Sequence, residues 1–202
     1  MHIRELLPED ARQVAELHIA GIQTGFISSL GVDFVTTVYE AIATSKNAFG
    51  LAAIRDDKII GFVTFSSNTV ALYKSVIFKK GLRFAFLLAG KLFSTKRIRN
   101  IAETILYPAK IKKKIELPQA ELLSIVVAEE KRGKGLSQEL LREGFSLCRQ
   151  RKIENVKVLV GADNKPANSL YQKCGFALVC QIQNHGIISN IYSGATNHFE
   201  NR

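Results

Sequence analysis

The sequence has few of the residues that build metal centres and disulfide frameworks. Its three cysteines, Cys148, Cys174 and Cys180, show no paired metal-ligand spacing, and any disulfide scheme leaves one of them over. The four histidines are scattered along the chain and form no cluster of ligands. We therefore expect no metal site and reduced thiols, which are typical of a cytoplasmic protein.

Long apolar runs are also missing. No run reaches the roughly 18 residues needed to cross a bilayer. The first ten residues, MHIRELLPED, lack the apolar centre of a signal peptide. There is no low-complexity tract, and 47% of the 202 residues are hydrophobic, which predicts a single folded domain over residues 1–202.

Acidic residues are nearly absent from residues 70–115. This segment holds twelve Lys or Arg and one acid, Glu103, while the net charge of the whole chain is +10. Helical periodicity fits most of it, and Gly81, Gly90 and Pro108 are expected to divide it into two or three helices. It is either a basic platform for an anionic partner, such as a phosphorylated substrate or a membrane surface, or an inserted helical subdomain with a solvated face. No nucleic-acid motif accompanies the charge, so a nucleic-acid partner is not expected.

The order of the remaining patterns predicts an α/β (α+β) domain. They read strand, helix, helix, strand, strand up to residue 66, and strand, helix, strand, helix, strand, strand from residue 119. Asp56-Asp57 is a hairpin signal, and residues 194–202 are expected to form a frayed tail. The expected strands are His2–Leu6, Phe49–Arg55, Lys58–Ser66, Gln119–Val127, Glu154–Val160, Phe176–Gln183 and Gly186–Ser193.

The stretch from Glu121 to Ser137, ELLSIVVAEEKRGKGLS, combines the features of a phosphate site. An apolar strand leads through a basic, glycine-containing turn into a helix. The first N–H groups of a helix have no partners within it, and the helix dipole favours an anion there. Arg132 and Lys134 add positive charge. The glycine spacing fits neither a dinucleotide fingerprint nor a P-loop, and an ordinary surface turn is the alternative.

A second stretch, NKPANSLYQKCGF, follows about thirty residues later, with Asp163 or Asn164 as the N-cap of a short helix. Together the two stretches resemble the motifs of the GNAT superfamily of acyl-CoA N-acyltransferases. Those motifs are a hydrophobic strand followed by Arg/Gln-x-x-Gly-x-Gly/Ala, and Asn-x-x-Ala-x-x-Leu-Tyr-x-Lys-x-Gly-Phe. The resemblance covers residues 119–180 closely and agrees with the element order of residues 1–68, whereas the 70–115 insertion has no counterpart in the minimal family fold.

The resemblance implies a mixed, mostly antiparallel sheet of six or seven strands flanked by helices, with a helical insertion between the third and fourth strands. Acetyl-CoA would enter where the fourth and fifth strands splay apart. The backbone of Ile125, Val126 and Val127 would hold the pantetheine and acetyl group, and one N–H would face the carbonyl oxygen as an oxyanion hole. The other implied CoA contacts are those to the pyrophosphate, from Arg132, Gly133, Lys134, Gly135, Leu136 and Ser137, and one from Asn164.

Tyr171 matches the position of the family's general acid. Attack of an amine on a thioester expels a thiolate, and a phenol with a pKa near 10 can protonate it; a packing role alone is the alternative. Ribosomal-protein alanine acetyltransferases carry their base twelve residues before this Tyr, where the present chain has Leu159. Glu121 is the candidate substitute, acting through water, and a strand-edge carboxylate without a catalytic role is its alternative.

We therefore expect an acetyl-CoA-dependent N-acetyltransferase in which a primary amine attacks the thioester directly. The charge of residues 70–115 favours a small anionic acceptor, such as an amino sugar derivative. A protein N-terminal or lysine amine is the second candidate. A CoA-binding module without activity, which docks on a membrane or an acidic partner through residues 70–115, is the non-enzyme alternative, and the oligomeric state stays open.

Overall fold

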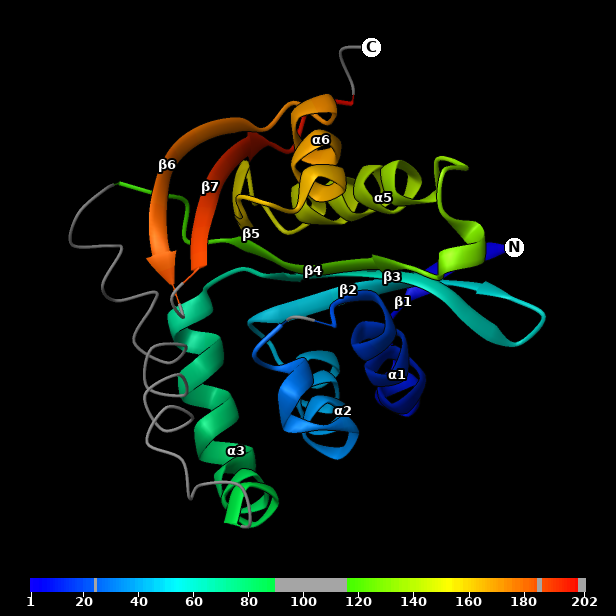
Figure 1. Cartoon of the computed structure of the whole chain (residues 1–202), viewed down its shortest axis with the longest axis vertical. Coiled ribbons are helices and arrows are strands. Elements are labelled where there is room, and N and C mark those ends of the chain that lie inside the picture. Colours follow the sequence, from blue (N-terminus) through cyan, green and yellow to red (C-terminus); the bar gives the residue numbers. More distant parts are fainter. Residues whose placement is uncertain (24, 90–115, 185–186, 200–202) are drawn as a thin grey trace.

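A computed structural model describes residues 1–23, 25–89, 116–184 and 187–199 of the chain. The described part contains a seven-stranded sheet in the order β1-β2-β3-β4-β5-β7-β6, with helices on both faces (Figure 1). The strands are β1 His2–Glu5, β2 Ala48–Arg55, β3 Lys58–Ser66, β4 Glu121–Val127, β5 Asn155–Gly161, β6 Ala177–Asn184 and β7 Ile187–Ala195. The α-helices are α1 Ala11–Gly21, α2 Val32–Ala43, α3 Thr69–Ala89, α5 Leu136–Gln150 and α6 Lys165–Lys173.

The sheet is mixed and mostly antiparallel, as predicted. Only the β4–β5 pair is parallel among the described strand pairs. The hairpin predicted at Asp56-Asp57 is confirmed, because both residues adopt positive φ, at 51° and 57°, as a tight two-residue hairpin loop requires. The predicted fold class is therefore confirmed, with seven strands.

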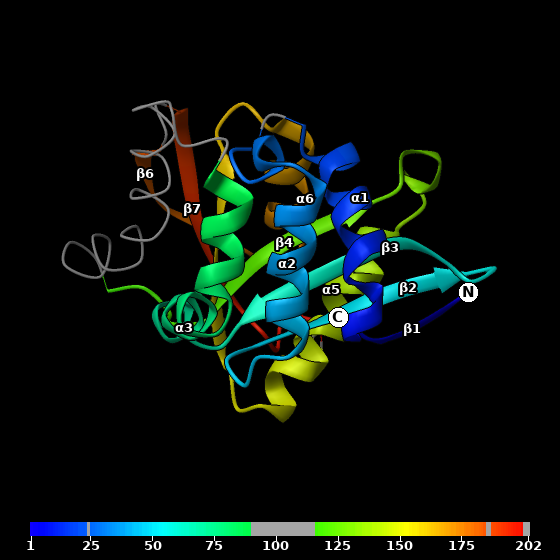
Figure 2. The same cartoon turned by 90° about the horizontal axis from the view of Figure 1, so that it is seen from below.

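Helices cover the two faces of the sheet with separate cores. Helices α5 and α6 lie on one side of the central strands, and α1 and α2 lie on the other (Figure 1). Seen from below, α3 stands beside α2 on that second side (Figure 2). Helix α5 buries one apolar face, since Leu136, Leu140, Leu141 and Phe145, which recur at helical spacing, are all buried. Each face of β4 thus contributes to a different apolar cluster.

Strands β4 and β5 separate soon after they begin. Glu121 lies opposite Lys157 and Leu122 opposite Val158, and the pairing of these two strands ends there. β5 continues in a ladder with β7, and β4 continues in a ladder with β3. The splay expected of the fourth and fifth strands is therefore present, and it opens toward the end of β4 that leads into the glycine turn.

A β-bulge interrupts β4 at the same level. Opposite β3, Ser124 faces Thr64 and Leu122 faces Phe65, so Leu123 is the extra residue. The bulge resets the alternation of side chains, and Leu123 and Ser124 both point to the α1–α2 side of the sheet. It therefore brings three side chains of one short stretch, including Glu121, to a single face.

Two expectations about the chain between and beyond the motifs were wrong. Helix α3 runs from Thr69 through Gly81 to Ala89 without a break, because one glycine weakens a helix by only about 1 kcal/mol and the helix packs against α2. Gly90 and Pro108 lie outside the described residues. The expected frayed tail is ordered up to residue 199: β7 extends to Ala195, Thr196 is buried, and Phe199 packs on Phe145 at 5.8 Å.

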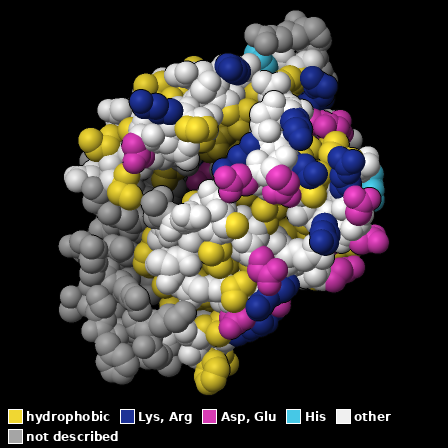
Figure 3. All heavy atoms as spheres, turned by 45° about the vertical axis from the view of Figure 1, so that its right-hand side comes forward, with side chains coloured by type: hydrophobic (Ala, Val, Ile, Leu, Met, Phe, Trp, Pro, Cys, Tyr) yellow, Lys and Arg dark blue, Asp and Glu magenta, His cyan; other side chains and the backbone are white. Residues whose placement is uncertain are grey.

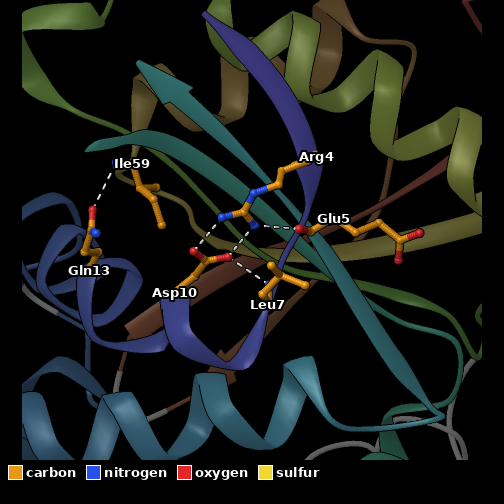
Figure 4. A network of polar contacts seen from close by, with 6 residues as sticks. All are labelled: Arg4, Glu5, Leu7, Asp10, Gln13 and Ile59. Carbon is orange, nitrogen blue, oxygen red and sulfur yellow. Dashed lines mark hydrogen bonds and ion pairs between the residues drawn. The ribbon is translucent and has the colours of Figure 1, made fainter. Parts of the chain in front are cut away.

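A polar network fixes the start of α1 against the sheet (Figure 4). Arg4 on β1 makes a two-pronged contact with the Asp10 carboxylate, at 2.6 and 2.9 Å, and the backbone N–H of Leu7 donates to the same carboxylate at 2.8 Å. One turn later, the Ile59 N–H donates to Gln13 at 3.1 Å. Burial opposes ionisation of Asp10, but the hydrogen bonds from Arg4 and Leu7 outweigh it, and its pKa lies below the ordinary value.

We expect Asp10→Asn to lower the free energy of unfolding by about 2 kcal/mol at neutral pH, since it removes a paired charge and leaves Arg4 without its partner. A group with a depressed pKa stabilises the fold above its unfolded pKa, about 3.9, so the difference from wild type should shrink only below about pH 4. Urea denaturation measures it, with the exposed neighbour Glu9→Gln as control. Equal stability of the two variants would contradict this role.

Candidate active site

The turn between β4 and α5 has the geometry of an anion site. Gly133 and Gly135 adopt φ values of 73° and 82°, and Gly135 is the residue before the first turn of α5. A Cβ at either position would meet nothing within 4 Å, so the backbone conformation, and not space, calls for glycine there. In the described chain, the N–H groups from Gly133 to Ser137 donate to no carbonyl, whereas those of Gln138 and Glu139 bond to Gly135. The turn therefore presents a run of free donors at a helix N-terminus.

Two basic side chains belong to this turn: Arg132 precedes the run of free N–H groups, and Lys134 lies within it. Arg132 Nε donates to the carbonyl of Val127 at 3.1 Å, which holds the guanidinium against the end of β4. Lys134 is exposed, and its ammonium lies 3.5 Å from the carbonyl of Glu130. The side of the molecule that carries this turn is hollowed, and side chains of both charge signs surround the hollow (Figure 3). The turn predicted to wrap a pyrophosphate thus has the donors and the charge for it.

The segment Ile125–Val127 forms one wall of the splay. On one edge it pairs with β3, where these three residues face Val63, Phe62 and Gly61. On the other edge the described β5 has already turned away. Apart from the Val127 carbonyl, which accepts from Arg132, the described backbone N–H and C=O groups on this edge have no strand partner and can pair with an extended ligand, as at any open strand edge.

Helix α6 lies on the far wall of the splay. Asn164 is its N-cap, and the side-chain oxygen of Asn164 accepts from the Ala167 N–H at 3.2 Å. Asn168 was not singled out from the sequence, yet it is buried and fully bonded: it donates to Gly161 and Asn164 and accepts from Asn190 and Tyr192. These bonds tie α6 to β7 and fix the orientation of the helix.

Tyr171 projects from α6 into the core beneath the splay. Its side chain is 5% exposed and packs against Phe176 and Tyr192, with ring centroids 5.5 and 6.2 Å away. Burial, with Cys174 adding to it, raises the pKa of the phenol above its ordinary value, so the hydroxyl keeps its proton at neutral pH. A general acid must be protonated before the reaction, and Tyr171 meets that condition.

Glu121 begins β4 on the opposite face of the sheet. It is 6% exposed, accepts from Thr69 Oγ1 at 3.0 Å, and lies 3.5 Å from Lys157 Nζ. Both contacts fall on Oε2, and Glu121 lines a cavity on this face of the sheet. Burial raises the pKa of this carboxyl above its ordinary value, against the opposing effects of Lys157 and Thr69. Lys157 is held in turn by the carbonyls of Pro118 and Gln119.

That cavity has a volume of about 410 Å³ and lies between the α1–α2 connection, α2, α3 and β4. Apolar side chains form most of its walls, and Phe26, Ile27 and Leu30 of the α1–α2 connection are among them. The cavity lies beside β4, one face of this strand away from the splay, and that position makes it the candidate acceptor site.

Three polar side chains that the sequence did not single out also line the cavity. His18 Nδ1 and the Tyr39 hydroxyl are 2.7 Å apart, and Ser124 hydrogen-bonds the same hydroxyl. Burial lowers the pKa of His18 to about 4, so the imidazole is neutral at pH 7. The three residues come from α1, α2 and β4, and no sequence motif connects them.

The neutral state of His18 predicts a pH-dependent stability. A base with a depressed folded pKa stabilises the fold above its unfolded pKa, about 6.5, and that contribution is lost as the pH falls toward 4. The shift corresponds to about 3 kcal/mol at most. We expect His18→Gln to remove most of the fall in unfolding free energy between pH 7 and pH 4.5, as measured by urea denaturation. An unchanged slope would show that other groups cause the fall.

The described part of the basic segment does not line the cavity with charge. Lys80 and Arg83 on α3 both contact Glu40 on α2, at 3.2 and 2.7 Å. No Lys or Arg is among the described residues that line the cavity. Lys74 and Lys79 also belong to α3 and do not line the cavity, and the other basic residues of the segment, from Lys91 to Lys114, lie outside the described residues.

Three further findings concern the described ranges only. No disulfide joins Cys148, Cys174 or Cys180 in these ranges. No group of three or more His, Cys, Asp and Glu side chains in those ranges could hold a metal ion. None of the described helices combines the length and the apolar character needed to cross a membrane.

Comparison with known proteins shows which family this chain matches. A model of the Acetyltransferase (GNAT) family matches residues 22–176, which include β4, the glycine turn and α6. A Bacillus subtilis (strain 168) protein, named as a candidate ribosomal protein bS18-alanine N-acetyltransferase, is 30% identical over 79 residues. The match covers 39% of this chain and 48% of that protein, so it spans about half the length of this relative.

Solved structures match over nearly the whole chain. The ribosomal-protein-S18-alanine N-acetyltransferase from Escherichia coli has a TM-score of 0.60 at 13% identity, covering 96% of this chain and 93% of that one. The PaiA N-acetyltransferase from Thermoplasma acidophilum, determined in complex with coenzyme A, has a TM-score of 0.55 at 15% identity, covering 96% and 99%. Identities this low establish a common fold and say nothing of a common acceptor.

Proposed function

Because this chain belongs to the GNAT family of acetyltransferases, and is thus an acyl-CoA-dependent N-acetyltransferase, we propose that it transfers the acetyl group of acetyl-CoA directly to the primary amine of a small molecule. One observation carries the proposal. The splay of β4 and β5 opens beside the free N–H groups of Gly133 to Ser137, so a strand edge and an anion site adjoin each other. A CoA thioester matches this arrangement, because its extended pantetheine arm adjoins its pyrophosphate.

The residues of this chain fit acetyl-CoA as follows. The free edge of Ile125–Val127 would pair with the pantetheine, and one of its N–H groups would stabilise the charge that develops on the acetyl oxygen. Arg132 and Lys134 would flank the pyrophosphate bound by the turn. The side-chain oxygen of Asn164 accepts the capping hydrogen bond of α6, so its side-chain NH2 group would be the one to contact CoA.

Two side chains would move the protons. Glu121, directly or through water, would take a proton from the amine as the N–C bond forms, and the raised pKa makes its carboxylate a stronger base than an exposed one. Tyr171 would donate its proton to the sulfur as the C–S bond breaks. The products are an amide and free CoA. No cysteine is assigned a covalent role, since Cys148 and Cys174 are buried in the core.

The described residues do not favour the anionic acceptor that the charge of residues 70–115 predicted. The acceptor cavity carries a carboxylate and no described cation, and an anionic group would face Glu121. We therefore do not propose an amino sugar phosphate or a similar anion. Three cysteines that form no disulfide in the described ranges agree with a cytoplasmic location, which we also propose.

A protein N-terminal amine is a second candidate. The 30% identity with the Bacillus subtilis protein favours it. Leu159 on β5 argues against it, because the resemblance to the alanine acetyltransferases would call for an acidic residue at that position.

A thiol-release screen tests the proposed function. The protein is mixed with acetyl-CoA and panels of alkylamines, arylalkylamines, amino sugars, polyamines, amino acids and peptides. We expect free CoA and an acetylated product with at least one amine class. Binding of acetyl-CoA without release of CoA in any panel would favour a CoA-binding module instead.

A further inference from the structure

The cavity beside β4 is more apolar than a site that only has to bind an amino group needs to be. It has room for roughly a dozen water-sized units at ~30 Å³ each. Its walls come from the inner side of α3, through Leu72, Val76 and Phe84, and from the facing side of α2, through Phe34 and Val38. Phe34 and Phe84 also contact each other across it, with centroids 4.7 Å apart. Water held in such a space makes few hydrogen bonds, so an apolar ligand would displace it favourably.

The polar groups of this cavity gather on its β4 side. Glu121 and Ser124 come from β4 itself, and the bulge at Leu123 is what places both on this face. Tyr39 on α2 hydrogen-bonds Ser124, and His18 on α1 contacts the same Tyr39 hydroxyl at 2.7 Å. Glu121 is the one carboxylate among the described lining residues, and its Oε2 accepts from Thr69 at 3.0 Å and lies 3.5 Å from Lys157 Nζ. The cavity is thus mostly apolar, with its polar side chains near the strand that would hold the acetyl group.

We propose that this cavity selects a primary amine attached to a hydrophobic body, such as an alkylamine or arylalkylamine. This inference rests on the proposed function, because it assigns the acceptor of the same site. The body occupies the space between α2 and α3, and the amine lies at Glu121 and Ser124. A cationic ammonium in an apolar cavity is stabilised by a nearby carboxylate, whereas an anionic or sugar-like body would lose its hydration there without new partners.

The acyl chain of a longer acyl-CoA is the competing occupant. It would use the apolar walls equally well, but it would bring no hydrogen-bonding group to the polar side chains beside β4. The amine is favoured because the polar groups form a cluster at one end, next to β4, where Tyr73 of α3 also lies within reach of the Glu121 charge, and most of the remaining described lining is apolar.

A series of amines of equal charge tests the selection. Going from propylamine to hexylamine adds three methylenes, and kcat/KM should rise on the order of 50-fold, or about fourfold per methylene. Glucosamine and putrescine should be poor acceptors. The competing occupant is tested with hexanoyl-CoA and propylamine. The kcat/KM of this pair should show no comparable gain over that of acetyl-CoA and propylamine.

A substitution at Gly81 tests the location. Gly81 lines the cavity from α3, and an added Cβ would meet nothing within 4 Å, so Gly81→Phe adds a ring at a lining position whose first side-chain atom meets no clash, and it removes a weak helix position. We expect it to lower kcat/KM for hexylamine at least tenfold and to leave acetyl-CoA binding unchanged. Lys79→Phe places the same ring at an exposed position outside the cavity lining and should stay within about twofold of wild type.

The outcomes separate this inference from the proposed function. Transfer to amines with a flat or hydrophilic preference, or an unaffected hexylamine rate in Gly81→Phe, would overturn the hydrophobic acceptor and leave the transferase standing. A gain with hexanoyl-CoA that replaces the gain with hexylamine would assign the cavity to the acyl chain. Absence of transfer to every amine, with acetyl-CoA bound, would overturn both.

Discussion

Replacing Tyr171 by Phe is expected to lower kcat by a factor of about 10² to 10⁴ while the fold stays intact. The ring that packs against Phe176 and Tyr192 is preserved, and only the hydroxyl is lost. The thiolate would then have to leave without a proton from the enzyme. The defect should be smaller for an acyl donor whose leaving thiol has a lower pKa, because such a thiolate needs less help.

Tyr192→Phe is the matched control. Tyr192 is also buried in this core, but its hydroxyl donates to Asn168 at 2.9 Å and so has a structural partner. We expect this variant to lose about 1 kcal/mol of stability and to keep its kcat within a few-fold of wild type. If Tyr171→Phe turned over normally at every pH while Tyr192→Phe did not, the acid would have been assigned to the wrong tyrosine.

The second large effect is expected from Glu121→Gln. The amide keeps the size of the side chain and can still accept from Thr69, but it cannot take a proton from the amine. We expect kcat/KM to fall by about 10² to 10³. In the wild type, the rate should fall at acidic pH as the Glu121 carboxylate is protonated, and its raised pKa moves this limb above the ordinary range of Glu. The variant should lack the limb.

This substitution also leaves Lys157 without its anionic partner in a buried place, so the fold needs its own measurement. Lys157 keeps its bonds to Pro118 and Gln119, which limits the loss of stability. Thermal unfolding and acetyl-CoA binding report whether the fold survives, and Glu129→Gln, an exposed acid just after β4, is the control. Normal activity of Glu121→Gln between about pH 6 and pH 9 would place the base elsewhere or assign it to solvent.

The sequence was informative wherever function depends on neighbouring residues. The free donors of the β4–α5 turn, the cap at Asn164 and the apolar face of α5 follow from short patterns, and all were found where the motifs placed them. The positions of the seven strands along the chain followed from the pattern of apolar and polar residues. Local chemistry and the family motifs agreed, so these elements could be predicted.

The acceptor cavity could not be predicted, because it depends on contacts between distant segments. His18, Tyr39 and Ser124 lie on three elements and meet only when α1 and α2 pack on β4. The bulge at Leu123 shifts the alternation of β4 by one residue, and nothing in LLSIVV marks it. Charge counted along the chain also does not show what each basic side chain faces: Lys80 and Arg83 contact Glu40 and do not line the cavity.

Gly81 does not interrupt its helix, contrary to the prediction from sequence. Gly81 was expected to end a helix, and α3 continues through it because tertiary packing against α2 outweighs a small propensity penalty. The same residue leaves space on the inner side of α3, where it lines the cavity.

The central claim is direct transfer from the CoA thioester to an amine held beside β4, and product stoichiometry tests it most directly. The protein is incubated with labelled acetyl-CoA, with and without hexylamine, and the acetylated amine, free CoA and intact protein are quantified by mass spectrometry. The account predicts equal amounts of acetylated amine and CoA, and no acetylated protein when the amine is left out. Acetyl-protein that passes its label to a later addition of amine, or CoA release without acetylated amine, would contradict it.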